Sequence, residues 1–137
     1  MSDALVAAAR KARGRAYAPY SRFRVGAAVR AGGRIAAAAN VENASYGLSI
    51  CAERAAVAAA VAAGARRLEA VAVASGTVPP TPPCGMCLQT LAEFAGPALP
   101  VTLAGARGSL ARTTLGALLP RGFSREDLAR LPGRRGR

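Results

Sequence analysis

Apolar residues recur with helical spacing in several stretches of the chain. In the first stretch, Leu5, Ala8 and Ala12 would share one face of a helix. Ser2 and Asp3 favour a helix start there, and Pro19 follows its end. The helices predicted in this way cover residues 3–16, 50–63, 85–94 and 114–119, with a last helical turn over residues 124–131. The helix over residues 50–63 is apolar all round, which is typical of a buried helix.

Alternating or continuous apolar runs predict strands between these helices. Residues 23–30 alternate, Gly32 and Gly33 suit a hairpin turn, and residues 35–41 form the returning strand. The short run over residues 68–75 is typical of a central strand. The remaining strands are expected over residues 100–104 and 109–113. Helices alternate with strands in the middle of the chain, which predicts an α/β fold with three α/β/α layers around a mixed five-stranded sheet.

The length of 137 residues is that of one domain with a real core. We expect a single domain over residues 1–137, with residues 132–137 as a disordered tail. No apolar run approaches the length of a membrane span, and the start lacks the pattern of a secretory signal. The protein is therefore expected to be soluble and cytoplasmic, without a membrane partner.

The net charge of +12 raises the question of a polyanionic partner. All nineteen basic residues except Lys11 are arginine, and aromatic residues, which would stack on bases, make up only 4% of the chain. The coding bias of a GC-rich genome explains this composition better than a nucleic-acid site does. Contact with nucleic acid is expected to be weak and non-specific.

Two short stretches carry the candidate chemistry. Cys51-Ala52-Glu53 and Pro83-Cys84-Gly85-Met86-Cys87 hold all three cysteines, and the chain has no histidine. Both stretches lie where a loop turns into a predicted helix, and a helix start stabilises a thiolate. Three thiolates can bind a tetrahedral zinc and leave its fourth position to water, for which Glu53 could move protons. Such a cluster has a net charge of −1, so Arg54 is expected to donate to the sulfurs.

Each feature also has a simpler explanation. The Cys-x-x-Cys could be a redox pair, the zinc could be structural with Glu53 as its fourth ligand, and Glu53 could be a solvated cap. Together, however, the Cys-x-Glu at one helix start and the Pro-Cys-x-x-Cys about thirty residues later match the three-cysteine form of the zinc deaminase signature.

The resemblance extends beyond the metal. The chain from about Ala4 to about Leu128 resembles the small homotetrameric cytidine deaminases, most clearly over residues 17–29, 40–54, 83–94 and 118–123. This implies a cytidine deaminase-like fold, one Zn²⁺ per subunit, and a homotetramer with shared active sites.

The resemblance also implies a role for individual residues. Cys51, Cys84 and Cys87 would be the zinc ligands. Glu53 would move protons from the activated water to N3 of the base and then to the leaving amine. Asn40 and Glu42 would bind the ribose, chiefly its 3′-hydroxyl. The remaining substrate contacts would come from Phe23, from the backbone of Ala52, and, across subunits, from Ala44, Tyr46 and Phe123.

The implied reaction is hydrolytic deamination of cytidine and deoxycytidine to uridine and deoxyuridine with release of ammonia, as in pyrimidine salvage. The alternatives are a blasticidin-type antibiotic or single-stranded polynucleotide as substrate, or a non-catalytic zinc scaffold. The chain departs from the family where Leu88 replaces a usual arginine and Arg24 a usual proline, which would put a charge near the pocket mouth. Alanines also replace larger residues on the helix after Glu53.

Overall fold

The computed structural model describes residues 2–130 and 132. The helices are α1 (Ser2–Arg13), α2 (Ala52–Ala62), α3 (Gly85–Phe94), α4 (Leu115–Leu118) and α5 (Arg125–Ala129), with 3₁₀ turns at Tyr46–Leu48 and Ala106–Gly108. The strands are β1 (Gly26–Ala31), β2 (Arg34–Ala39), β3 (Ala70–Ala74), β4 (Pro100–Ala104) and β5 (Leu110–Thr114). Of the tail expected over residues 132–137, all but Pro132 lies outside the described residues.

The strands form one mixed sheet in the order β2-β1-β3-β4-β5. β1 and β2 pair as an antiparallel hairpin across Gly32 and Gly33, whose positive φ angles of 59° and 76° suit a two-residue turn. β3 and β4 pair in parallel, and α3 lies in the connection between them. The predicted α/β fold with a five-stranded mixed sheet is confirmed, as is the central position of β3.

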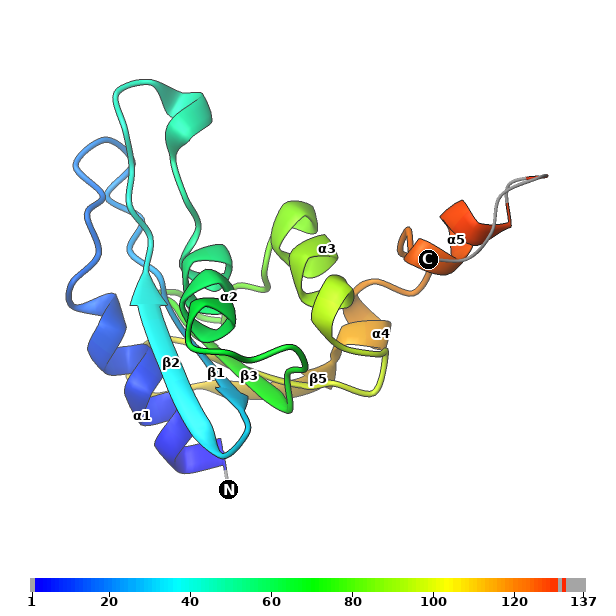
Figure 1. Ribbon diagram of the computed structural model, residues 1–137. Helices are drawn as coiled ribbons and strands as arrows, with labels where there is room; N and C mark the ends of the chain where they lie inside the picture. The colour runs from blue at the N-terminus through cyan, green and yellow to red at the C-terminus, as the bar shows by residue number, and fades with distance from the viewer. Residues whose placement is uncertain (1, 131, 133–137) are drawn as a thin grey trace.

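The sheet lies between helices on both faces (Figure 1). On one face, Leu5 and Ala9 of α1 pack against small side chains of the sheet, including Ala28 and Ala72. This contact is close: a Cβ atom on Gly26 would lie 2.0 Å from the carbonyl oxygen of Ala9. The small residues of β1 and β3 therefore allow α1 to lie against the strand backbones.

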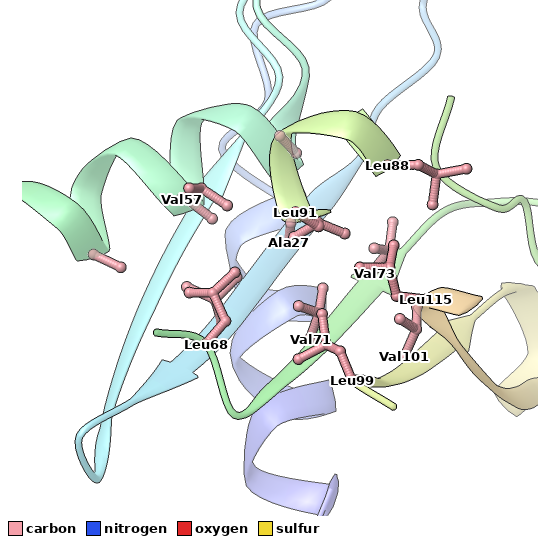
Figure 2. Packing of buried hydrophobic residues seen from close by; sticks show 14 of the residues in the cluster. Ala27, Val57, Leu68, Val71, Val73, Leu88, Leu91, Leu99, Val101 and Leu115 are labelled. Atoms are coloured by element: carbon pink, nitrogen blue, oxygen red, sulfur yellow. The ribbon is translucent and has the colours of Figure 1, made fainter. Parts of the chain in front are cut away.

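The larger core fills the opposite face, beneath α2 and α3. Val71 and Val73 of β3 alternate with the alanines that face α1, as strand geometry requires. Figure 2 shows Leu91 of α3 and Val57 of α2 on this side of the sheet with Val71. This packing brings the N-terminal ends of α2 and α3 toward the same place.

Two expectations about this side of the molecule were wrong. The predicted strand over residues 23–30 begins only at Gly26, because the amide of Asn40 binds the backbone of the preceding residues. The helix predicted as buried all round, α2, buries one face only. Ala58, Ala59, Ala62 and Ala63 are exposed in the single chain.

No helix within residues 2–130 has the length and apolar character to cross a bilayer.

Candidate metal centre and substrate pocket

The three cysteines converge where α2 and α3 begin. Cys51 is the N-cap of α2, Cys84 is the N-cap of α3, and Cys87 lies in the first turn of α3. Their Sγ atoms all lie within 4.8 Å of one another. The predicted meeting of two helix starts is confirmed.

The donor set fits zinc. In a tetrahedron with Zn–S bonds of about 2.3 Å, neighbouring sulfurs lie about 3.8 Å apart. The Sγ atoms of Cys84 and Cys87 are 3.6 Å apart, close to that edge. All three are free cysteines, ranging from exposed Cys84 to buried Cys87. A fourth, open position at the exposed side would suit a catalytic zinc rather than a closed structural one.

The electrostatics of the cluster also favour a cation. Burial raises the pKa of Cys51 and of Cys87, and the Glu53 carboxylate raises that of Cys87 further. Burial opposes ionisation of Cys84 too, but hydrogen bonds from the N–H and thiol of Cys87 and the N–H of Met86 outweigh it and lower its pKa. The expected stabilisation of thiolates by helix starts therefore prevails only at Cys84. Three thiolates beside a carboxylate need a cation among them.

Glu53 is a buried carboxyl group next to this cluster, with 5% of its surface exposed. Burial raises its pKa, against smaller opposing effects from its own backbone N–H and from the Cys87 thiol. A carboxyl group whose pKa is raised toward neutrality can both accept and return a proton. Its position in the first turn of α2 follows from the two-residue spacing after Cys51.

A cavity of about 320 Å³ opens over the metal centre. Four of the residues predicted to contact substrate line it, namely Phe23, Asn40, Glu42 and Ala52. Cys51, Cys84 and Glu53 line it as well, so the metal centre and the predicted substrate residues share one pocket. The other lining residues were not predicted, and they are Ser21, Val25, Ser49, Ile50, Val73, Ser75, Thr81 and Pro82.

A network of hydroxyl groups supports one wall of this cavity. The Thr77 hydroxyl donates to the carbonyl of Pro79 at 2.8 Å, and its oxygen lies 3.0 Å from Ser75 Oγ and 2.7 Å from Thr81 Oγ1. These bonds tie the end of β3 to the loop that leads to Cys84. In the sequence, the signal for this network is the run of hydroxyl and proline residues between the strand and Pro83.

Asn40 and Glu42 hold the facing loop. Asn40 Oδ1 accepts from the backbone N–H of Val25 at 2.9 Å, and its Nδ2 donates to the carbonyl of Phe23 at 2.8 Å. Glu42 Oε1 accepts from the backbone N–H groups of Tyr20 and Ser21 at 3.0 and 3.1 Å. Among the lining residues that were not predicted, Ser21 stands out because it lies only two residues before Phe23, which was predicted.

Three predicted contacts lie outside this chain's own pocket. Tyr46 is 76% exposed at the tip of its loop, where its ring meets that of Tyr20 edge-on at 6.2 Å. Ala44 is exposed in the same loop, which rises from the end of the sheet (Figure 1). Phe123 is 58% exposed, precedes α5, and its carbonyl accepts from Gln89 Nε2 at 2.6 Å.

The departures noted in the sequence have structural outcomes. Arg24 lines a separate surface hollow with Arg22 and Pro19, and it is not among the described residues that line the cavity. Leu88 is buried and joins the core beneath α3. Arg54 donates to Met86 Sδ at 2.9 Å, and the described part of the chain gives it no bond to a cysteine sulfur. Its role beside the thiolates stays a prediction.

Comparison with known proteins decides the family. Residues 1–102, which include all three cysteines, match the model of the cytidine and deoxycytidylate deaminase zinc-binding region. The chain belongs to the cytidine deaminase family. The family's zinc-binding region thus contains the three-cysteine cluster described above.

Similar proteins match nearly the whole length of the chain. The cytidine deaminase of Sporosarcina psychrophila is 45% identical over 128 residues, which cover 93% of this chain and 94% of that one. A crystal structure of cytidine deaminase from Burkholderia pseudomallei superposes with a TM-score of 0.86 at 47% identity, covering 90% of this chain and 99% of that one. The cytidine deaminase structure from Mycobacterium tuberculosis gives a TM-score of 0.77 at 41% identity, covering 89% and 96%.

Replacing one thiolate should release the metal. We expect Cys84→Ser to weaken zinc binding by more than about 100-fold, because loss of an outer-shell partner alone costs about 10- to 100-fold. Metal analysis after gel filtration, together with the melting temperature, measures this without reference to activity. Met86→Leu is the matched control, since Met86 lies between the two ligands and offers no thiolate. Equal zinc content in both variants would contradict the assignment of Cys84.

Proposed function

We propose that this protein catalyses the zinc-dependent hydrolysis of cytidine and deoxycytidine to uridine and deoxyuridine, releasing ammonia, as one domain over residues 1–137. The observation that carries the proposal is a buried carboxyl group, Glu53, beside a three-thiolate cluster at the base of a pocket. The same pocket presents an aromatic ring and a polar pair, which suit a flat base and a sugar. The membership of this chain in the cytidine deaminase family supports the same reaction.

The metal ligands in this proposal are Cys51, Cys84 and Cys87, with one Zn²⁺ per chain. When bound, zinc acts as a Lewis acid that makes a water molecule a stronger acid. All three cysteines are free of disulfide bonds, and the cytoplasm keeps thiols in that state. We place the protein there, in pyrimidine salvage.

Glu53 is the proton carrier of the reaction. As water adds to C4 of the base, Glu53 takes up one of its protons and delivers it to N3. Glu53 then takes the proton of the new hydroxyl group on C4 and gives it to the amine. The C4–N4 bond breaks, ammonia leaves, and C4 becomes a carbonyl. A carboxyl group whose pKa burial has raised is suited to both transfers.

The polar pair and the aromatic ring would orient the nucleoside. Glu42 is an acceptor for a sugar hydroxyl, and Asn40 can donate through the second hydrogen of its amide. Phe23 offers an apolar face to the base. The backbone of Ala52, which lies beside the metal centre, would contact the carbonyl group of the base. Each of these groups lines the cavity that Glu53 lines.

A free nucleoside suits this pocket better than a nucleotide or a polynucleotide. Among the described residues that line the cavity, the charged side chains are Glu42 and Glu53, both acidic, and none is basic. A phosphate group would meet a carboxylate at the sugar end of the pocket. The +12 charge of the chain therefore lies outside the site, and nucleic acid would be bound only weakly elsewhere.

Replacing Glu53 tests the reaction itself. Glu53→Gln should lower kcat for cytidine by about 10²- to 10⁴-fold, because the amide cannot carry the proton, while zinc content and melting temperature are kept. Loss of cytosine absorbance measures the rate. The matched control is Glu93→Gln, which alters an exposed glutamate on α3 that pairs with Arg125. Undiminished turnover by Glu53→Gln would refute its role, and an inactive, zinc-loaded parent protein would refute the proposed function.

Charge at the sugar end predicts discrimination against nucleotides. The kcat/KM for deoxycytidine should exceed that for deoxycytidine 5′-monophosphate by at least about tenfold, owing to repulsion between phosphate and Glu42. The ratio should fall in Glu42→Gln and at high salt, where this repulsion is removed or screened. Preference for the monophosphate would reverse the assignment of substrate.

We further propose that the active unit is a homotetramer whose subunits complete one another's sites. Three features support this: the exposed alanine face of α2, the exposed Tyr46, and the place of Phe123 outside its own chain's cavity. An aromatic side chain that is exposed in the single chain but needed over a base would be supplied by a neighbour.

Mixing a variant that binds substrate weakly with a variant that lacks the proton carrier tests the shared site. Phe123→Ala should raise the KM for cytidine about tenfold or more without loss of zinc, because a stacking face is removed. Co-refolding it with Glu53→Gln should restore tight binding at sites that combine an intact Glu53 with a neighbour's Phe123. Steady-state kinetics measures the recovery, and native mass spectrometry confirms that hybrids form. Hybrids without recovery would show that Phe123 serves no neighbouring site.

A further inference from the structure

Ser21 joins the two parts of the pocket that would hold the sugar and the base. Its hydroxyl donates to Glu42 Oε2, and its oxygen accepts from the backbone N–H of Phe23 at 3.0 Å. All three residues line the same cavity. One hydroxyl group thus links the carboxylate to the chain segment that carries the aromatic ring.

The contacts of Glu42 show which of its acceptor sites remains open. A carboxylate has about four lone-pair positions, two on each oxygen. Oε1 accepts from the N–H groups of Tyr20 and Ser21, at 3.0 and 3.1 Å, and so uses both of its positions. Among the described residues, the Ser21 hydroxyl is the one group that donates to Oε2, which leaves one position for a ligand.

The open position belongs to the oxygen whose direction depends on Ser21. Rotation about the last bond of a glutamate side chain is soft, so the carboxylate plane is set by its hydrogen bonds. The two backbone N–H groups fix Oε1, and the Ser21 hydroxyl fixes the plane by holding Oε2.

The surrounding loops are themselves held in place. Asn40 ties down the backbone at Phe23 and Val25, and the backbone of Tyr17 bonds to both Asn40 and Glu42. The two loops rise side by side from one end of the sheet (Figure 1). Removal of the Ser21 hydroxyl would therefore change the orientation of the Glu42 carboxylate more than the conformation of the loops.

We propose that Ser21 is a positioning residue that aims Glu42 Oε2 at a hydroxyl group of the substrate's sugar, an inference that rests on the proposed function. The hydrogen bond from Ser21 is also the leading cause that lowers the pKa of Glu42. The carboxylate stays ionised, so it accepts a hydrogen bond and does not donate one. Ser21 thereby selects substrates that carry a hydroxyl donor at that place.

The decisive experiment compares two substrates in one variant. Ser21→Ala should raise the KM for cytidine roughly tenfold with little change in kcat, the effect expected when a hydrogen bond to a charged group is lost. The KM for 3′-deoxycytidine should change less than about twofold, because it lacks the 3′-hydroxyl, which is the sugar donor that the family resemblance assigns to Asn40 and Glu42. Ser21→Thr, which keeps the hydroxyl, should restore the KM for cytidine, and Ser21→Ala should add little in a Glu42→Gln background.

Ser109→Ala is the matched control, because that serine also bonds through its hydroxyl but lies in the turn before β5. Equal rises in KM for both nucleosides, or Ser21→Ala kinetics like those of Ser109→Ala, would overturn the proposal. If Ser21→Ala does not fold, Ser21→Thr decides, through the ratio of its KM for 3′-deoxycytidine to its KM for cytidine. A ratio equal to that of the parent protein would support the proposal, and a ratio near one would overturn it. A parent protein that does not deaminate cytidine would instead overturn the proposed function.

Discussion

The structure depends on the convergence of three thiols and a carboxyl group at the starts of two helices. Burial opposes ionisation of Cys51, Cys87 and Glu53, and repulsion from neighbouring negative groups adds to it at the two cysteines, so the cluster holds its negative charges only around a cation. A zinc ion is therefore as much a part of this region as the side chains that would bind it. The same burial makes the carboxyl group a weaker acid, which suits it to the proton transfers of the proposed reaction.

The sheet and its two cores bring these groups together. Small residues on one face let α1 lie close to β1 and β3, and larger side chains on the other face carry α2 and α3. Because both helices cross that face and begin at the same end of the sheet, their N-caps meet. The loops from β1 and β2 close the pocket from the opposite side, and Asn40 and Glu42 bond these loops to one another.

Much of the fold and the metal centre could be predicted from the sequence. The bounds of α3 and β4 were predicted to the residue, because prolines and glycines flank both elements. The local patterns placed Cys51, Cys84 and Cys87 at helix starts, and their resemblance to the zinc deaminase signature predicted that they meet. Local patterns of this kind depend on few neighbours and survive folding unchanged.

The features that could not be predicted from the sequence depend on contacts between distant segments. The alternating pattern at residues 23–25 continues that of β1. However, the side-chain amide of Asn40 binds the N–H of Val25 and the carbonyl of Phe23, which are then not available for pairing with a strand. A helix surface made mostly of alanine does not indicate which side faces the sheet, so the exposed face of α2 was not foreseen. Ser21 has a common residue type, and only its bond to Glu42 in the folded chain shows its importance.

The most direct test is a zinc titration of the metal-stripped protein, with zinc binding and conversion of cytidine to uridine measured on the same samples. The account predicts that both rise together and reach their plateau at one zinc ion per chain. Turnover in the stripped protein, or a full complement of zinc without any turnover of cytidine, would contradict it.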